Sequence, residues 1–185
     1  MCANSSVSMG GIGSVCDPGC SRDSGQDGAV HGISIRPAHH GELEAVAELR
    51  WRWGNEVNRT PVVTQQGFVR QFVTWALQSE DTHRCMVLLR DDVLIGMAWL
   101  AITQRVPHPG ALDRLSGDVQ CVYVLPDERG GGLGGLLIEA VLAHARDLGL
   151  ERVTVHSSDR AVSAYRRHGF VVSPRLLQIE TTPPR

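Results

Sequence analysis

The stretch V-Q-C-V-Y-V-L-P-D-E-R-G-G-G-L-G-G-L-L, Val119 to Leu137, decides how this chain folds. Its first part is rich in β-branched and aromatic residues, which are typical of a buried strand. Pro126 has no N–H group and cannot continue a central strand, so we expect the strand to end there. Glycine then fills every position but one from Gly130 to Gly135, just before an apolar, helix-forming run.

A glycine-rich turn at the start of a helix is typical of an anion-binding site. Because the turn lacks Cβ atoms, it exposes its N–H groups and lets a bulky ligand approach the backbone. The first four N–H groups of a helix also have no internal partner, and the helix dipole places positive charge there. The sequence therefore predicts a site for a phosphate-bearing ligand.

The absence of lysine narrows the choice of that ligand. All 18 basic residues are arginines, which excludes a Walker-type loop and any enzyme built on a lysine Schiff base with pyridoxal phosphate. Three of the glycines satisfy G-x-G-x-x-G, but a dinucleotide fold expects an acidic residue about 20 positions later, and Asp159 comes late. Such a fold is also purely parallel, whereas Asp91 and Asp92 predict a hairpin.

Two motifs resemble those of the GNAT superfamily of N-acetyltransferases. R-G-G-G-L-G, Arg129 to Gly134, matches Q/R-x-x-G-x-G/A, and A-V-S-A-Y-R-R-H-G-F, Ala161 to Phe170, is similar to A-x-x-x-Y-x-x-x-G-F. They follow in the family's order and at its separation, and the resemblance covers about Ile33 to Ile179. It implies that the ligand is acetyl-CoA, used as a co-substrate whose acetyl group is transferred to an amine.

The expected fold class is α/β. Periodicity and turn residues predict strands at 31–37, 83–90, 93–104, 117–125, 152–156, 170–172 and 176–179, and helices at 39–57, 64–78, 133–148 and 159–168. The resemblance implies a GNAT-like mixed, largely antiparallel sheet of about six or seven strands, flanked by about four helices. Such a sheet splays between its fourth and fifth strands, where the pantetheine arm of the cofactor can use unpaired backbone groups.

Length and composition predict a single cytoplasmic domain. The chain has 185 residues and a net charge of −2 at pH 7, and no apolar run approaches the roughly 20 residues of a membrane span. We therefore expect neither a nucleic-acid nor a membrane partner. The domain would occupy residues 31–180, after a disordered tail at 1–30 and before a frayed end at 181–185. Cys16 and Cys20 do not suffice for a metal site, and we expect none.

The resemblance places the cofactor along the central stretch. The glycine turn would hold the diphosphate, and Arg129 would hold the loop or contact a phosphate. Ser158 stands where the family often has an asparagine that touches the cofactor, although Ser157 or Ser158 could equally be a helix N-cap. The expected cofactor contacts are Val122, Tyr123, Val124, Arg129, Gly130, Gly131, Gly132, Gly134, Gly135 and Ser158.

Acetyl transfer needs a base for the amine, donors for the thioester oxygen and a proton for the leaving thiolate. The resemblance makes Tyr165 the acid. The N–H groups of Val122 and Val124, which alternate onto one face, are the candidate oxyanion donors. Asp118 is the nearest carboxylate for the base and is expected on that same face. A water chain, or a pocket that binds an already neutral amine, is an equal alternative.

The cysteines offer no acyl-enzyme nucleophile, since Cys121 should point away from the valine face, so we expect direct transfer in a ternary complex. The acceptor would be a primary amine of a small molecule or peptide, and Glu56, Asp113 and Asp118 could complement its ammonium charge. Apolar residues near the C-terminus are compatible with a homodimer. The alternative function is an acyl-CoA-binding sensor module without transferase activity.

Overall fold

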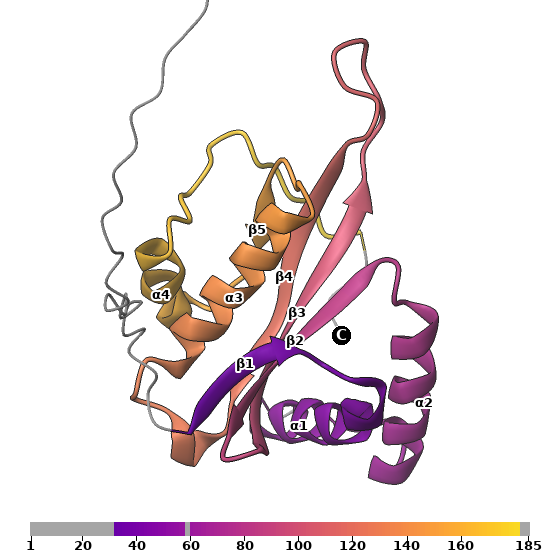
Figure 1. The fold of residues 1–185 in the computed structure, drawn as a ribbon, viewed down its shortest axis with the longest axis vertical. Coiled ribbons are helices and arrows are strands. Elements are labelled where there is room, and N and C mark those ends of the chain that lie inside the picture. Colours follow the sequence, from indigo (N-terminus) through magenta and orange to yellow (C-terminus); the bar gives the residue numbers. More distant parts are fainter. Residues whose placement is uncertain (1–31, 58–59, 182–185) are drawn as a thin grey trace, which may run out of the picture.

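The computed structural model describes residues 32–57 and 60–181 (Figure 1). The expectations for residues 1–30 and 182–185 lie outside these ranges. The elements, in chain order, are β1 (Ile33–Pro37), η1 (His40–Glu42), α1 (Leu43–Glu56), α2 (Gln65–Gln78), β2 (His83–Arg90), β3 (Val93–Gln104), β4 (Leu115–Val124), η2 (Pro126–Glu128), α3 (Leu133–Asp147), β5 (Val153–Val155), η3 (Asp159–Ala161) and α4 (Val162–Arg167), where η marks a 3-10 helix.

The strands form one sheet in chain order, β1-β2-β3-β4-β5. The first four are antiparallel to their neighbours, and β5 runs parallel to β4. The predicted mixed, largely antiparallel sheet is therefore confirmed, with 5 strands in the described part of the chain instead of about six or seven. The hairpin expected around Asp91 and Asp92 is also confirmed: both residues have positive φ, 47° and 64°, which suits a tight turn between β2 and β3.

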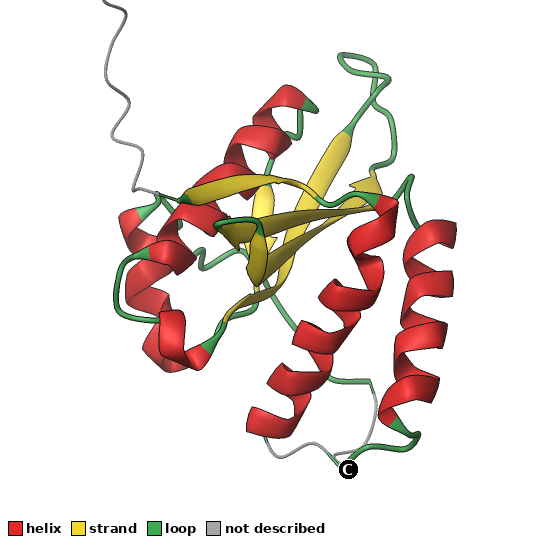
Figure 2. Cartoon of the chain, turned by 60° about the horizontal axis from the view of Figure 1, so that its bottom comes forward, coloured by secondary structure: helices red, strands yellow, loops and turns green. Residues whose placement is uncertain are grey.

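Helices cover both faces of the sheet (Figure 2). On one face, Leu137 and Val141 of α3 are fully buried. They pack in one cluster with strand residues such as Leu88 and with Tyr165 of α4. On the other face, Val46 of α1 and Ala76 of α2 pack against the strands. None of the described helices is long and apolar enough to cross a membrane.

The aromatic residues of α2 serve packing. The rings of Phe68, Phe72 and Trp75 follow one another at centroid distances of 5.6 and 5.4 Å, and Phe72 also contacts Trp99 of β3 at 5.7 Å. Aromatic contacts of this kind stabilise a core beyond simple burial. Phe72 and Trp75 therefore form a contact surface between α2 and the sheet.

A β-bulge interrupts β4 at Cys121. The register of β3 against β4 shifts there, so that one residue of β3 opposes two of β4. Cys121 has a φ of 54°, a left-handed conformation that costs about 1–3 kcal/mol for a residue other than glycine. Because the bulge inserts one residue, it reverses the alternation of side chains along the strand.

The prediction that Asp118 shares a face with Val122 and Val124 is therefore wrong. Val119 packs on the α3 face together with both of these valines, although strict alternation would separate them. Asp118, next to Val119 along the strand, consequently points to the α1 face. Cys121 packs with the cluster on the α1 face, so its predicted direction, away from the two valines, is confirmed.

The expected terminal strands at 170–172 and 176–179 are absent from the described residues. Val171, Leu177 and Ile179 are 84%, 89% and 84% exposed. Pro174 lacks an N–H group, and the Leu176 N–H donates back to the Ser173 carbonyl at 3.3 Å, which forms a turn. Apolar alternation becomes a strand only where a ladder partner and a sheet face are available, and here the segment has neither.

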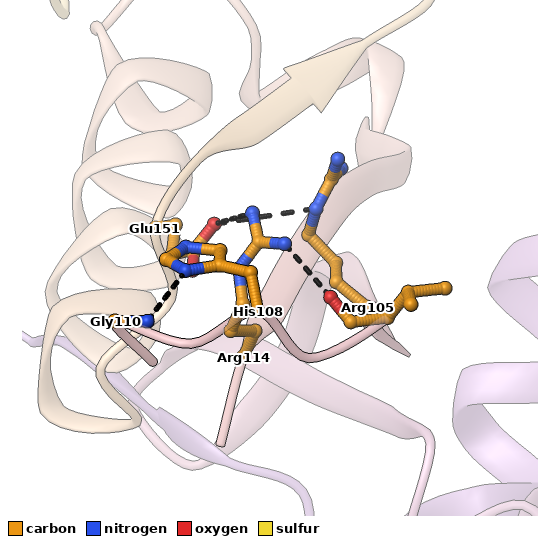
Figure 3. A network of polar contacts seen from close by, with 6 residues as sticks. Arg105, His108, Gly110, Arg114 and Glu151 are labelled. Carbon is orange, nitrogen blue, oxygen red and sulfur yellow. Dashed lines mark hydrogen bonds and ion pairs between the residues drawn. The ribbon is translucent and has the colours of Figure 1, made fainter. Parts of the chain in front are cut away.

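An ion-pair network fixes the parallel pair of strands (Figure 3). Arg114 precedes β4 and donates two hydrogen bonds to the Glu151 carboxylate, at 2.7 and 2.9 Å, and one to the Val106 carbonyl at 2.8 Å. The Arg114 guanidinium lowers the pKa of Glu151, so the pair stays charged at neutral pH. The Glu151 N–H also donates to the Leu115 carbonyl at 3.0 Å, which holds the start of β5 beside the start of β4.

The two parallel strands separate soon after this clamp. β4 pairs with β5 only from Gly117 to Val119, facing Val153 to Val155. From Gln120 onward no strand within the described ranges lies along this edge of β4. The predicted splay between the fourth and fifth strands is confirmed.

Gly96 pairs with Val124 of β4, and we predict that Gly96→Ala destabilises the fold. A Cβ at this position would lie 2.9 Å from the Tyr123 carbonyl oxygen and 3.1 and 3.3 Å from the Leu88 and Leu137 side chains. The free energy of unfolding should fall by about 1–3 kcal/mol, measured as a lower urea midpoint at unchanged slope. Gly54→Ala, in open space on α1, should instead raise it by about 0.5–1 kcal/mol. A neutral Gly96 variant would contradict this account.

Candidate active site

The loop between β4 and α3 presents a series of backbone N–H groups. Gly130 and Gly132 have φ of 97° and 78°, and Gly132 is the N-cap of α3. No described residue accepts a hydrogen bond from the N–H groups of residues 130–134. A Cβ at Gly130, Gly131, Gly132 or Gly134 would meet nothing within 4 Å. Positive φ values and open N–H groups at a helix start are the features with which many proteins bind anions.

Gly135 differs from the other glycines of the loop. Its N–H donates to the Gly132 carbonyl at 2.8 Å, and a Cβ on it would lie 2.8 Å from Nε2 of His168. The missing side chain therefore lets the end of α4 approach the first turn of α3. The sequence pattern contains no signal that separates this packing role from the open loop positions.

Arg129 stands at the loop entrance, where the protein itself holds its guanidinium. Nε donates to the Val124 carbonyl at 2.9 Å, and a terminal nitrogen donates to the Glu56 carboxylate at 2.7 Å. The guanidinium carbon also lies 5.4 Å from the centroid of the Tyr123 ring. Of the two roles expected for Arg129, these contacts favour holding the loop.

Glu56, the last residue of α1, joins the helix to the loop and to β4. One carboxylate oxygen accepts from the Tyr123 hydroxyl at 2.5 Å, and the other pairs with Arg129. Burial raises the pKa of Glu56, but the Tyr123 and Arg129 donors outweigh it, so the pKa is lowered overall. Burial, then the Glu56 carboxylate, raises the pKa of Tyr123 to about 12. At neutral pH the pair is an anion and a neutral phenol.

These residues line a cavity of about 320 Å³ that joins the end of α1, the unpaired part of β4, the loop entrance and η3. Its lining is Trp53, Glu56, Val57, Val122, Tyr123, Val124, Arg129 and Arg160. The structure thus brings together four of the predicted cofactor contacts. It adds Trp53 and Arg160, which no sequence motif singled out for this site, and Glu56, which the sequence offered only as one of several acidic residues.

Tyr165 of α4 is buried, and its ring meets the Phe170 ring edge-on at 5.3 Å. Burial raises its pKa to about 12, and Cys121 and Asp118 add to the shift. Tyr165 packs in the same core cluster as Val119 and Val155, the last residues that pair β4 with β5. Tyr165 lines a second cavity, of about 1100 Å³, between α3, β5, α4 and the segment that follows.

Asp118, Ser158 and Asp113 line neither cavity. Asp118 accepts hydrogen bonds from the Gln120 side chain at 3.0 Å and from the Thr154 hydroxyl at 3.2 Å. Ser158 is the N-cap residue of η3, although its side chain makes no capping hydrogen bond. Asp113 is exposed in the β3–β4 connection, at the opposite end of β4 from the 320 Å³ cavity.

Comparison with known proteins identifies the family. The sequence profile of the acetyltransferase (GNAT) family matches residues 43–170, from the start of α1 through the glycine loop to Phe170. This match extends over more than half of the chain and includes both motifs that carry the resemblance. The protein belongs to the GNAT acetyltransferase family.

Particular relatives share only part of their length with this chain. A mycothiol acetyltransferase from Propionibacterium freudenreichii is 26% identical over 133 residues, 64% of this chain and 41% of the relative. Another from Cellulomonas flavigena is 38% identical over 85 residues, 44% of this chain and 24% of the relative. An amino-acid acetyltransferase from Mannheimia succiniciproducens is 32% identical over 103 residues, 56% of this chain and 20% of the relative. The chain therefore spans less than half the length of each.

Solved structures agree with the fold. A predicted acetyltransferase from Clostridium acetobutylicum, crystallised with acetyl-CoA, has a TM-score of 0.67 at 14% identity, covering 80% of this chain and 96% of that chain. An aminoglycoside N-acetyltransferase in complex with CoA has a TM-score of 0.59 at 21% identity, covering 80% and 94%. At these identities the likeness establishes the shared architecture.

Both tyrosines of the chain should ionise late in the folded protein. Each pKa is raised to about 12 from 10.0, so phenolate absorbance measured just after a pH jump should rise near pH 12, and near pH 10 in urea. Because the folded pKa exceeds the unfolded one, the associated stability is complete below about pH 10 and is lost as the pH rises through 12. A folded-state transition near pH 10 would contradict the burial of both phenols.

Proposed function

We propose that this protein transfers the acetyl group of acetyl-CoA to a primary amine of a small molecule or peptide. The observation that carries this proposal is the run of open N–H groups at residues 130–134, directly beside the unpaired edge of β4. The first feature suits the diphosphate of CoA, and the second suits an extended amide-containing arm. The family match supports the same reading.

The cofactor would lie along β4 with its thioester near the bulge. Its pantetheine arm would bond to backbone groups from Val122 to Val124, and the N–H groups of Val122 and Val124 would stabilise the thioester oxygen. The open N–H groups of residues 130–134 would hold the diphosphate, and Gly135 would support the loop by its packing against α4. Ser158 would contact the arm from η3. Arg129 would keep the loop in place through Glu56 and the Val124 carbonyl.

Direct transfer would proceed within the ternary complex. The amine nitrogen attacks the thioester carbon, a tetrahedral intermediate forms, and the carbon–sulfur bond breaks. Tyr165 would hydrogen-bond to the departing sulfur, since a phenol with a pKa of about 12 keeps its proton at neutral pH. A phenol with this pKa is a weaker acid than a thiol, whose pKa is roughly 8.5. A phenolate that forms by giving its proton to the thiolate therefore takes a proton back from solvent.

The proton of the attacking amine needs an acceptor, for which Asp118 stays our proposal. Its two oxygens already accept from Gln120 and Thr154, and the bulge that follows it puts Val122 and Val124 on the other face of the sheet. A water chain, or entry of a neutral amine, removes the need for this carboxylate. Because Gln120 and Thr154 already occupy the proposed base, the contacts of Asp118 also favour a second candidate function. This function is an acyl-CoA sensor that binds the cofactor without turnover.

The names of the relatives support a small-molecule acceptor, because they are called mycothiol and amino-acid acetyltransferases. A cytoplasmic location and a homodimer remain predictions.

Isothermal titration with acetyl-CoA tests the glycine cradle. Gly131 has open space around it and no positive φ, so Gly131→Leu fills the cradle without straining the backbone. We predict at least about tenfold weaker binding of acetyl-CoA at an unchanged melting temperature. Gly41→Leu, also in open space but on η1, should bind like the wild type. Absence of binding by the wild type at millimolar acetyl-CoA would refute the cofactor assignment.

Replacing Tyr165 by Phe tests the chemistry. We predict that Tyr165→Phe lowers kcat by about 100-fold, as expected for loss of an acid, and leaves the Kd for acetyl-CoA within about twofold.

Asp118→Asn should lower kcat if Asp118 is the base, whereas Asp113→Asn, in the exposed connection, should leave kcat unchanged. The measurement is CoA thiol release with a panel of amines. Tight cofactor binding without release on any amine would favour the sensor.

A further inference from the structure

Three charged side chains line the 320 Å³ cavity: Glu56, Arg129 and Arg160. Glu56 and Arg129 form an ion pair at 2.7 Å and compensate each other. Arg160, from η3, forms no ion pair with any carboxylate of the described residues. The cavity therefore presents one guanidinium whose charge is not compensated by a bonded partner.

Glu56 can bind a further donor while it holds its present partners. A carboxylate has about four lone-pair sites, and only two donors, Tyr123 and Arg129, occupy them among the described residues. Its charge is retained at neutral pH, because these donors lower its pKa and the nearby Arg160 lowers it further. An amino group in the cavity would therefore find a charged acceptor in Glu56.

The other walls of the cavity are aromatic or aliphatic. Trp53 and Val57, at the end of α1, line the cavity together with Val122 and Val124 of β4. The Arg50 guanidinium lies 4.0 Å from the centroid of the Trp53 ring, which holds that ring in place. The cavity thus combines three charged side chains with an aromatic ring and the aliphatic residue Val57.

The charge balance selects between kinds of amine. A simple alkylammonium would engage Glu56 but add a positive charge to a cavity that already holds two guanidinium groups, and this repulsion opposes its binding. A molecule that carries both an amino group and a carboxylate would engage Glu56 and Arg160 together. The planar guanidinium of arginine binds a carboxylate, as it binds a phosphate, in a two-point contact.

We propose that the acceptor is an α-amino acid, with its amino group on Glu56 and its carboxylate on Arg160. This inference rests on the proposed function and names its substrate class. In the reaction, the nitrogen–acetyl bond forms and the carbon–sulfur bond breaks. The ammonium gives up two protons, one to the CoA thiolate and one to solvent. The product is an N-acetyl amino acid, whose uncharged amide is held less firmly by Glu56 than the ammonium was.

The test compares amino acids with the amines that lack only the carboxylate: L-alanine with ethylamine, L-leucine with isopentylamine, and L-phenylalanine with phenethylamine. CoA thiol release gives kcat/KM for each. For each pair that reacts, the wild type should favour the amino acid by at least about tenfold. Arg160→Gln should lower kcat/KM for the amino acids by about 10- to 100-fold and change that for the amines by less than about twofold.

Two controls separate this role from others. Arg167→Gln makes the same change of charge on the exposed side of α4, and it should preserve the amino-acid preference. Titration of the Arg160→Gln variant with acetyl-CoA shows whether Arg160 binds the cofactor instead of the acceptor. If it does, the substitution weakens acetyl-CoA binding and lowers kcat/KM for both the amino acid and the amine of each pair.

That last result would overturn the inference, as would a wild type that uses the amines as well as the amino acids. A wild type that binds acetyl-CoA and acetylates other amines, but none of the three amino acids, would overturn it while the proposed function stands. A wild type that binds no acetyl-CoA would remove the proposed function itself.

Discussion

The short contact between β4 and β5 is the constraint on which the site depends. The strands pair only from Gly117 to Val119, and the Arg114–Glu151 ion pair clamps that end. Beyond it, the bulge at Cys121 turns β4, and the edge facing β5 is left without a strand in the described part of the chain. Backbone groups at a sheet edge need partners, so the same geometry that ends the pairing prepares β4 to bind an extended ligand.

A second set of contacts joins this edge to the acceptor side. Glu56 lies at the C-terminal end of α1, where the helix dipole disfavours a negative charge. Its bonds to Arg129 and Tyr123 outweigh that cost and tie α1 to the glycine loop and to β4. The carboxylate and the loop are thereby positioned by each other. Arg160, which forms no ion pair with a carboxylate of the described residues, completes the charge pattern of the cavity.

Much of the fold could be predicted because its signals are local. Asp91 and Asp92 suit a tight turn, apolar periodicity marks α1, α2 and α3, and the glycine run marks an open loop. Two predictions failed because their causes are not local. The bulge at Cys121 reverses the face of Asp118, and it occurs without the glycine that often marks such a site. The alternating residues after α4 resemble strands, yet a strand exists only where a partner accepts its hydrogen bonds.

The amino-acid sequence by itself determined the two motifs and the glycine run of the loop, and the family resemblance of these motifs made Tyr165 the candidate acid. Each depends on residue type at a fixed spacing, because glycine conformation and helix starts are properties of neighbouring residues. Only the tertiary structure decided that Glu56 meets Arg129, 73 residues away, and that Arg160 lines the same cavity. Long-range contacts of charged side chains depend on how the sheet twists and where its strands part, and no local pattern encodes that geometry.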